Sequence, residues 1–388
     1  MAIKGKVKAA IIGCGKVGHT HAQAYQRLPV SDLAAVCDVS LERAKAYGKT
    51  YGVKGYQDLE QMLLENPIDV LSVCTPHPLH AATIQRAASH GIHVLTEKPL
   101  ASDLSDCDMA IHACRRNHVK LGVISQRRFY PPIQRIKAAI AAGKIGQPII
   151  GDLVVLGWRD EAYYAMDTWR GKWQAEGGGV LVNQTIHQLD LLVWLMGPID
   201  ELFGYWDNFN HPFIEVDDTA AALMRFKSGA IGQVLVSNSQ KPGFYGKIHI
   251  HGSNGASVGA QTEGGSPFVA GMTTKVDPPI NDIWTVPGEE RLLETWQEED
   301  RMNAEKVDTM TYYHQLQIED FIHAVLEDRE PAVTGEAARE AVELFTGIYR
   351  SQRDHQPTRF PLQAELDKDD FDGRLSYLPF SHREVSAP

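Results

Sequence analysis

Short apolar runs alternate with helix-like segments through the first third of the chain. Continuous apolar strands separated by helices are typical of a parallel sheet covered on both faces. We therefore expect residues 1–125 to form one doubly wound α/β domain. The apolar runs lie at 7–12, 32–37, 70–74, 92–96 and 119–125, and the helical segments between them at 19–27, 41–51 and 80–90.

The rest of the chain has a different pattern, in which apolar and polar positions alternate with the period of two expected of strands. We expect residues 126–388 to form an α+β domain on a large, mostly antiparallel open sheet that serves substrate binding and oligomerisation. Expected strands are 146–158, 199–206, 219–226, 230–237 and 247–251, and expected helices are 180–196, 308–326 and 335–352. Turns at 227–229 and 253–255 suit antiparallel connections, and the polar tail after residue 362 is expected to be a surface extension.

Composition narrows the class of protein. A chain of 388 residues favours two domains, and 43% hydrophobic with 22% charged residues is typical of globular proteins. The net charge of −11 disfavours a nucleic-acid surface, which needs clustered positive charge. Five cysteines without a Cys-x-x-Cys pair indicate reduced thiols. No apolar run is long enough for a membrane span, so we expect a cytoplasmic protein without a membrane partner.

A glycine motif follows the first strand and opens the first helix. It reads Gly13-Cys14-Gly15-Lys16-Val17-Gly18. In such a motif the first glycine makes the turn, the second admits a pyrophosphate and the third allows close helix packing, while the helix N-terminus attracts phosphate. Asp38 follows Gly18 by 20 residues, where a carboxylate accepts from a ribose 2′-hydroxyl. No arginine adjoins Asp38, since Arg43 lies a helical turn away, so NAD is favoured over NADP.

Further motifs occur in order along the chain. They are Cys74-Thr75-Pro76-His77-Pro78-Leu79-His80, Glu97-Lys98-Pro99, Glu176-Gly177-Gly178-Gly179-Val180 followed by His187 and Asp190, and Val216-Asp217-Asp218-Thr219. Together with the glycine loop, this combination resembles the glucose-fructose oxidoreductase / inositol dehydrogenase (Gfo/Idh/MocA) family from about residue 8 to residue 361.

The resemblance implies a Rossmann domain followed by an antiparallel-sheet domain, in proteins that are often dimers or tetramers paired through the open sheet face. It places Thr75 and His77 near the cofactor ribose and Lys98 and His187 at the reacting carbon, and it implies a cis peptide before Pro99. The expected cofactor-binding residues are Gly13, Gly15, Lys16, Val17, Gly18, Asp38, Thr75, His77, His80, Glu97 and Gln126.

Asn183 departs from the pattern of the family. Many dehydrogenases of the family carry an acid at this position and use a Lys–Asp–His set, whereas some branches have the Asn-Gln-x-x-His form found here. The proton relay of this chain is therefore left open by the sequence.

Alcohol oxidation needs a base, and Lys98 is the first candidate. A free lysine with a pKa of about 10.4 is a poor base at neutral pH. A cationic nicotinamide about 4 Å away would cost the ammonium roughly 4 kcal/mol at an effective dielectric constant near 20, which lowers its pKa toward neutrality. The alternative is a solvated surface lysine.

His187 is the second candidate. In a continuous helix it shares one face with Asn183 and Asp190, so Asp190 can fix the imidazole tautomer. The three glycines before the helix allow a close backbone approach, which favours a pocket. The alternative is a core histidine with satisfied hydrogen bonds.

Aromatic and guanidinium side chains gather at 158–173, just before that helix. Aromatic faces beside several donors suit a sugar, and they favour a pyranose or pyranoside over a cyclitol; the alternative is core tryptophans with surface arginines. The expected substrate-binding residues are Lys98, Arg159, Trp169, Arg170, Asn183 and His187, and Gln126, Arg127 and Arg128 are further candidates for the cleft. The spacing of the histidines gives no acid-rich ligand set, so no metal is expected.

Three functions fit these residues. The first is an NAD-dependent dehydrogenase that oxidises a secondary alcohol of a sugar, glycoside or cyclitol. The second is an NAD-using glycosidase or epimerase that oxidises its substrate transiently. The third is a non-catalytic NAD- or sugar-sensing regulatory protein, which the presence of both Lys98 and His187 disfavours.

Overall fold

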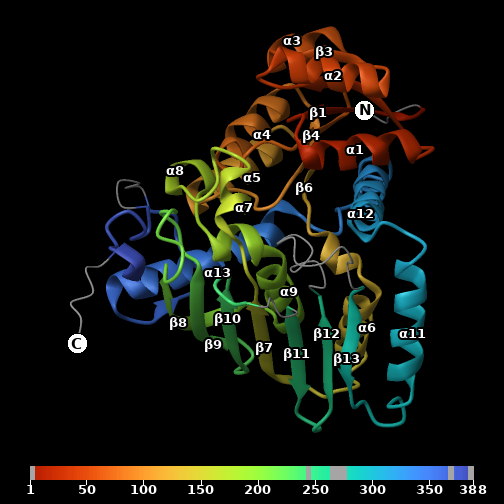
Figure 1. The fold of residues 1–388 in the computed structure, drawn as a ribbon. Helices are drawn as coiled ribbons and strands as arrows, with labels where there is room; N and C mark the ends of the chain where they lie inside the picture. The colour runs from red at the N-terminus through yellow and green to blue at the C-terminus, as the bar shows by residue number, and fades with distance from the viewer. Residues whose placement is uncertain (1–4, 242–245, 263–277, 366–370, 383–388) are drawn as a thin grey trace. The chain divides into compact units, whose positions relative to one another are not determined.

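The chain forms two compact units in the computed structural model, which describes residues 5–241, 246–262, 278–365 and 371–382 (Figure 1). The first unit comprises residues 1–101, 105–126 and 309–339. The second comprises residues 102–104, 127–308 and 340–388.

The first unit contains a six-stranded parallel sheet with the order β3-β2-β1-β4-β5-β6. The doubly wound sheet expected from the sequence is confirmed. Its strands are β1 (Val7–Ile12), β2 (Ser31–Cys37), β3 (Lys54–Tyr56), β4 (Val70–Val73), β5 (His93–Thr96) and β6 (Leu121–Val123). The intervening helices are α1 (Lys16–Arg27), α2 (Leu41–Tyr51), α3 (Leu59–Glu65), α4 (His80–Ser89) and α5 (Leu104–Arg116), with short 3₁₀ turns η1 (His77–Leu79) and η2 (Gln126–Phe129).

A late segment of the chain returns to the first unit, so the division differs from a single cut at residue 125. Helix α12 (Thr309–Leu326) buries Ile318, Phe321 and Ile322 in the same apolar cluster as the residues of β1 and α1. Gln317 also pairs with the backbone of β6, donating to the carbonyl of Val123 at 2.8 Å. The apolar face of α12 therefore completes the core of the first sheet.

The second unit contains an eight-stranded sheet with the order β13-β12-β11-β7-β10-β9-β8-β14. The expected mostly antiparallel sheet is confirmed, because among its described strands β7 and β10 alone form a parallel pair. The strands are β7 (Pro148–Leu156), β8 (Ile199–Asp207), β9 (Thr219–Phe226), β10 (Ile231–Ser237), β11 (Lys247–Gly252), β12 (Ser257–Gln261), β13 (Ile280–Trp284) and β14 (Thr358–Arg359).

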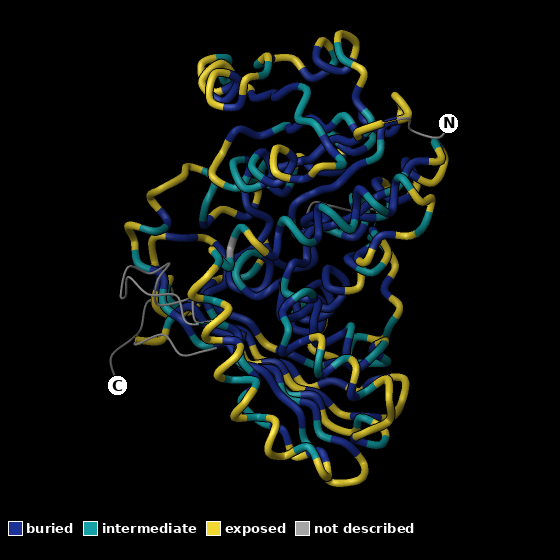
Figure 2. The backbone as a smooth tube through the Cα atoms, turned by 90° about the vertical axis from the view of Figure 1, so that its right-hand side faces the viewer, coloured by how far each residue is buried: buried dark blue, intermediate teal, exposed yellow. Residues whose placement is uncertain are grey.

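Helices cover one face of this sheet, and the other face has exposed side chains. Helix α9 lies against β7 and β11, and α6 lies against β12 and β13. Exposed and buried positions alternate along β9 and β10, as Figure 2 shows. The helices of this unit are α6 (Pro131–Ala141), α7 (Glu161–Ala165), α8 (Trp173–Glu176), α9 (Ile186–Met196), α11 (Leu292–Ala304) and α13 (Gly335–Asp354), of which α13 begins in the first unit, with a 3₁₀ turn η4 (Phe380–His382). No helix within the described ranges is long and apolar enough to cross a membrane.

The expected continuous helix at 180–196 is wrong. Residues Val180–Gln184 form a π-helical turn (η3), and α9 begins only at Ile186. Both the backbone N–H and the hydroxyl of Thr185 donate to the carbonyl of Val180, at 3.0 and 2.8 Å. This bond over five residues widens the turn, so the spacing of a regular α-helix cannot be used to place Asn183 against His187.

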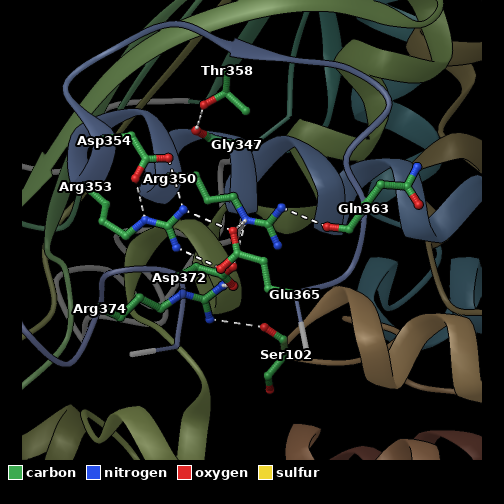
Figure 3. Close-up of polar contacts among 10 residues, drawn as sticks. All are labelled: Ser102, Gly347, Arg350, Arg353, Asp354, Thr358, Gln363, Glu365, Asp372 and Arg374. Carbon is green, nitrogen blue, oxygen red and sulfur yellow. Dashed lines mark hydrogen bonds and ion pairs between the residues drawn. The ribbon is translucent and has the colours of Figure 1, made fainter. Parts of the chain in front are cut away.

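The expectation that the tail is a surface extension is wrong for the part around Arg374. Arg374 is fully buried and donates to the carbonyl oxygens of Gly177 at 2.7 Å and Ser102 at 3.1 Å. Its other terminal nitrogen pairs with Asp372, which also accepts from Arg350 of α13 at 2.8 Å (Figure 3). These contacts anchor the tail at Asp372 and Arg374, whereas Leu375, Leu378 and Phe380 are exposed. The same expectation for residues 366–370 and 383–388 lies outside the described residues.

Candidate active site

The glycines of the dinucleotide motif have three different environments. Gly13 has a φ of +99°, and a Cβ there would collide with the carbonyl of Cys74. A Cβ on Gly18 would collide with the carbonyl of Gly13. Gly15 has open space, with no atom within 4 Å of its ideal Cβ position. Two glycines are thus required by the packing of the chain, and the third leaves room beside the start of α1.

Helix α1 begins directly at this open space. Lys16 and Val17 are its first two residues, and its first turn contains no acidic side chain. Lys16 is exposed, whereas Val17 packs against the apolar core. A helix N-terminus whose first turn carries no acidic side chain presents N–H groups and positive partial charge to an anion. The loop therefore fits a phosphate group.

Asp38 lies directly after β2 and holds the glycine loop. One carboxylate oxygen accepts from the backbone N–H of Cys14 at 2.9 Å. The other accepts from Ser40 N and from Nε and Nη2 of Arg43. Burial raises the pKa of Asp38, but the hydrogen bonds from Arg43, Ser40 and Cys14 outweigh it and hold the pKa below its usual value. The carboxylate is therefore charged at neutral pH, and Arg43 reaches it although it lies five residues away.

Thr75 follows β4 at the same edge of the sheet. Its Oγ1 is buried and has no hydrogen-bond partner among the described residues, which suits an atom that binds a ligand. His77 is 7% exposed and begins the next turn. His80 is fully buried, and its two ring nitrogens contact the carbonyls of Thr75 and Pro99, both at 2.9 Å. His80 thus fixes the loops that follow β4 and β5 relative to each other.

Glu97 and Lys98 follow β5. Glu97 is buried and accepts from His21 at 3.0 Å, with His314 of α12 at 3.6 Å. Burial raises the pKa of Glu97, but the two histidines outweigh it and hold the pKa well below its usual range. Its second oxygen accepts from the backbone N–H of Lys98 at 3.2 Å, and this bond holds the backbone at Lys98.

The peptide bond between Lys98 and Pro99 is cis, so the expectation from the family resemblance is confirmed. Lys98 is half-buried. Gln126, the last of the expected cofactor-binding residues, is 4% exposed and begins the turn after β6. The carboxyl ends of the parallel strands therefore bring the glycine loop, Asp38, Thr75 and Lys98 to one edge of the sheet.

In the second unit, the glycines before His187 are required by contacts within the protein. A Cβ on Gly179 would collide with the carbonyl of Asp217, and one on Gly177 would collide with the side chain of Ser102. The carboxylate of Asp217 accepts from Gly179 N at 2.8 Å and from Leu181 N at 3.0 Å. The close approaches that these glycines allow are to other residues of the same unit. The pocket that they were expected to favour stays a prediction.

His187 is 7% exposed in the first turn of α9. Both carboxylate oxygens of Asp190 accept from the guanidinium of Arg128, at 2.5 and 2.8 Å, and the pair is buried. The sequence suggested that Asp190 orients the imidazole and that Arg128 lines a cleft. The structure shows Arg128 and Asp190 as a bidentate ion pair, with Arg128 also 5.0 Å from the ring of Trp194. Orientation of the imidazole by Asp190 stays a prediction.

Tyr163 contacts the arginine side chains of the aromatic segment at 158–173. The guanidinium carbons of Arg159 and Arg170 lie 5.2 and 4.5 Å from its ring centre, and its hydroxyl contacts Arg170 at 2.7 Å. Arg170 also lies 4.5 Å from the ring of Trp169. Arg159, Trp169 and Arg170 are therefore parts of one cluster, which we call the Tyr163 cluster. Trp173 lies outside it, buried against Trp206 and Tyr349.

Glu176 is a functional candidate that the sequence analysis did not single out. Its side chain is fully buried and accepts from the backbone N–H of Gly171 and from the side-chain amide of Asn183. A carboxyl group thus contacts the residue that stands where many family members have an acid. The only sequence signal was its place directly before the three glycines, which by itself does not indicate contact with Asn183.

Within the described part of the chain, no group of three or more histidine, cysteine, aspartate or glutamate side chains is arranged to hold a metal ion. All five cysteines are buried and free of disulfides.

Comparison with known proteins agrees with this architecture. The family profile described as "Oxidoreductase family, NAD-binding Rossmann fold" matches residues 7–125, and the "GFO/IDH/MocA C-terminal domain" matches residues 133–258. Fold and loop define a two-domain, NAD-binding oxidoreductase. The two matches cover more than half of the chain, and it belongs to the Gfo/Idh/MocA family.

Its relatives include enzymes with known substrates. Myo-inositol 2-dehydrogenase of Thermotoga maritima is 29% identical over 254 residues, which is 64% of this chain and 74% of that protein. D-apiose dehydrogenase of Rhizobium rhizogenes is 29% identical over 241 residues, which is 61% of this chain and 68% of that protein. The crystal structure of the WlbA dehydrogenase from Bordetella pertussis in complex with NADH and UDP-GlcNAcA has a TM-score of 0.78 at 29% identity and covers 92% of this chain and 100% of that one.

Proposed function

We propose that this chain is an NAD-dependent oxidoreductase that oxidises a secondary alcohol of a sugar, glycoside or cyclitol. The observation that carries the proposal is the position of Lys98. It follows β5 at the edge of the sheet where the glycine loop follows β1 and Asp38 follows β2. An amine at the cofactor edge of a Rossmann sheet is placed to act as a base for a bound alcohol.

NAD is the cofactor that these residues fit best. Gly15 leaves space for a pyrophosphate, and the charged Asp38 carboxylate suits a ribose hydroxyl and repels a 2′-phosphate. The buried Thr75 hydroxyl, which has no hydrogen-bond partner in the described structure, is available to the nucleotide. Arg43 beside Asp38 works against this preference, because a guanidinium pairs with a phosphate.

The protein supplies the base and the placement of the reacting groups. NAD, when bound, would supply the hydride acceptor for the reaction. Lys98 takes the proton of the hydroxyl, and Glu97 fixes its backbone through the hydrogen bond to Lys98 N. His187 is the second proton acceptor that we propose, and Asn183 binds the reacting hydroxyl.

The substrate class follows from the Tyr163 cluster and from the relatives. Aromatic rings with adjacent guanidinium donors bind the C–H faces and the hydroxyls of a sugar. The relatives named above act on myo-inositol and D-apiose, and a third binds UDP-GlcNAcA. We therefore place the substrate among sugars, their glycosides and cyclitols.

We propose that two copies of the chain pair through the open face of the second sheet. On this face Tyr205 is 61% exposed and Leu223 is 64% exposed, and Ile231 and Leu235 are also exposed. Four large apolar side chains on neighbouring strands form a patch of the kind that is usually covered in an oligomer. A homodimer or homotetramer is the expected assembly.

A substrate panel tests the activity directly. Sugars, glycosides and cyclitols are each incubated with NAD and, separately, with NADP, and reduced cofactor is followed by absorbance. We expect net NADH with at least one member and weaker reduction of NADP. Turnover of a glycoside without net NADH would instead indicate transient oxidation, and binding without any turnover would indicate a sensor.

A further inference from the structure

Glu176 forms two hydrogen bonds that restrict how its carboxyl group can be used. One oxygen, Oε2, accepts from the backbone N–H of Gly171 at 2.5 Å. The other, Oε1, accepts from Nδ2 of Asn183. Because the backbone N–H is always a donor, Oε2 remains an acceptor whatever the charge of the carboxyl group. A proton on Oε1, which faces Asn183, is the one that can be donated to the amide oxygen of that residue.

Several charged and titratable groups surround this carboxyl group. Arg170 is the nearby cation, Asp217 is a buried acid, and the phenols of Tyr164 and Tyr349 also lie within electrostatic range. Burial raises the pKa of Glu176 to about 7, and Asp217 acts in the same direction, whereas the bonds from Gly171 and Asn183 and the charge of Arg170 lower it. The carboxyl group therefore changes its charge near neutral pH.

The charge of Glu176 determines the orientation of the Asn183 amide. An ionised carboxylate only accepts, so the amide must direct its NH₂ toward Glu176 and its oxygen away from it. A protonated Oε1 donates, so the amide is most stable with its oxygen toward Glu176 and its NH₂ away from it. Rotation of the amide by half a turn thus exchanges an outward acceptor for an outward donor.

We propose that Glu176 is a positioning residue, which acts through Asn183 to decide whether that amide offers an acceptor or a donor to the reacting hydroxyl. The inference rests on the proposed function, in which Asn183 binds that hydroxyl. A hydroxyl about to lose its proton donates a hydrogen bond, so the acceptor orientation is the active one. Ionised Glu176 therefore corresponds to the active enzyme, and protonation of Oε1 by solvent corresponds to the inactive one.

Three variants separate this role from a structural one. Glu176→Gln keeps its oxygen on Gly171 N and must present its NH₂ to Asn183, which imposes the donor orientation at every pH. We expect kcat/KM to fall about 10- to 100-fold, as for loss of one positioned hydrogen bond. Asn183→Asp has an outward acceptor whatever the charge of Glu176, so its ratio of kcat/KM at about pH 6 to that at about pH 8 should exceed the wild-type ratio.

The double variant Glu176→Gln/Asn183→Asp is the decisive test. The amide introduced at position 176 would donate to one oxygen of the carboxylate introduced at position 183 and leave the other oxygen outward, so we expect at least about tenfold recovery over Glu176→Gln. Glu215→Gln is the matched control, because Glu215 is exposed and accepts from Trp173 N in the same segment. It should retain wild-type kcat and KM. A double variant no more active than Glu176→Gln, or wild-type activity in Glu176→Gln, would overturn the proposal.

A spectroscopic measurement makes the test independent of any substrate. Infrared difference spectra of the whole protein between about pH 6 and about pH 8 should contain the C=O band of one protonated carboxyl group that Glu176→Gln lacks and Glu215→Gln retains. If the band is present and no sugar is oxidised, the proposed function fails while the titration of Glu176 stands. If sugars are oxidised and the band is absent, the positioning role fails alone. Should Glu176→Gln not fold, the band is assigned through its shift in Asn183→Asp, and an unshifted band refutes the contact.

Discussion

Arg43 donates from Nε and Nη2 to a single carboxylate oxygen of Asp38, at 3.1 and 2.8 Å. The side chain of Arg43 is 60% exposed and that of Asp38 6%, so Arg43 lies on the solvent side of the pair. In the cofactor site that we propose, the ionised acid repels a 2′-phosphate while it holds Arg43, and its removal would leave a free guanidinium in the same place. We therefore expect the Asp38–Arg43 pair to affect the affinity for a 2′-phosphate.

We accordingly expect Asp38→Ala to improve the ratio of kcat/KM for NADP to that for NAD by about tenfold or more, which corresponds to roughly 1.4 kcal/mol. The gain should require the freed Arg43. The double variant Asp38→Ala/Arg43→Ala should therefore lose most of the gain, and Arg43→Ala alone should not improve NADP use. An unchanged cofactor ratio in Asp38→Ala would refute the assignment of Asp38 to the ribose.

Replacement of Lys98 by alanine should remove the base without removing the cofactor site. We expect kcat to fall by about 10²–10⁴-fold, the usual contribution of a positioned base. The dissociation constant for NAD, measured by fluorescence titration, should change little, because the glycine loop and Asp38 are unaffected. Lys45→Ala on the exposed side of α2 is the control. A Lys98 variant with most of its kcat would remove this residue from the mechanism.

The free energy of unfolding should depend on pH because Glu176 titrates. Burial raises its pKa from 4.5 in the unfolded chain to about 7 in the folded protein, so between these values the folded state binds a proton that the unfolded state releases. Stability is therefore greatest below about pH 4.5 with respect to this group and falls as the pH rises to about 7, by at most about 3 kcal/mol. Urea titrations across this range should show a flatter profile for Glu176→Gln, and Glu215→Gln should keep the wild-type slope.

Arg374 should be important for the stability of the second unit. Arg374→Met removes the donor to the carbonyls of Gly177 and Ser102 and leaves Asp372 with one fewer buried partner. We expect a loss of about 3–5 kcal/mol in urea titrations. Arg359→Met is the matched control, since Arg359 is 77% exposed in its ion pair with Glu201 and should change stability by less than about 0.5 kcal/mol. Equal stability of the two variants would show that the buried contacts of Arg374 contribute nothing.

The open face of the second sheet should be the contact surface between copies of the chain. Leu223→Glu and Leu235→Glu each place a charge within the exposed apolar patch, which is costly if a second copy covers it. We expect sedimentation velocity to show dissociation to smaller species in both variants. Leu64→Glu on α3 introduces the same change at a leucine that is 76% exposed outside this sheet, and it should leave the assembly intact. Dissociation only in Leu64→Glu would place the interface elsewhere.

The features that were predicted well depend on residues that are contiguous in the sequence. Strand β9 and the ranges of β8 and β10 follow the expected bounds within a residue, because each strand repeats a two-residue alternation. Helix α2 matches its expected range because Ser40 caps its start and Gly52, with a φ of +72°, ends it. The cis peptide before Pro99 came from the family resemblance and not from local chemistry.

The errors arose where distant residues alter a local pattern. The apolar run at 180–196 gave no sign of a break, because the π-helical turn depends on capping by Asp217, which lies more than thirty residues later. The acidic and basic residues of the tail suggested exposure to solvent. Arg374 can be buried because its guanidinium pairs with Asp372 and with two backbone carbonyls.

The sequence by itself determined the two kinds of sheet, the dinucleotide loop, Asp38 and the candidates Lys98 and His187. The sheets, the loop and Asp38 depend on residue type at short spacing, which determines the secondary structure. The roles expected of Lys98 and His187 came from the family resemblance. Only the tertiary structure decided which groups meet: Arg43 with Asp38, Arg128 with Asp190, His21 and His314 with Glu97, and Glu176 with Asn183. An apolar or polar pattern records that a face is buried, but the identity of the buried partner is set by the path of the whole chain.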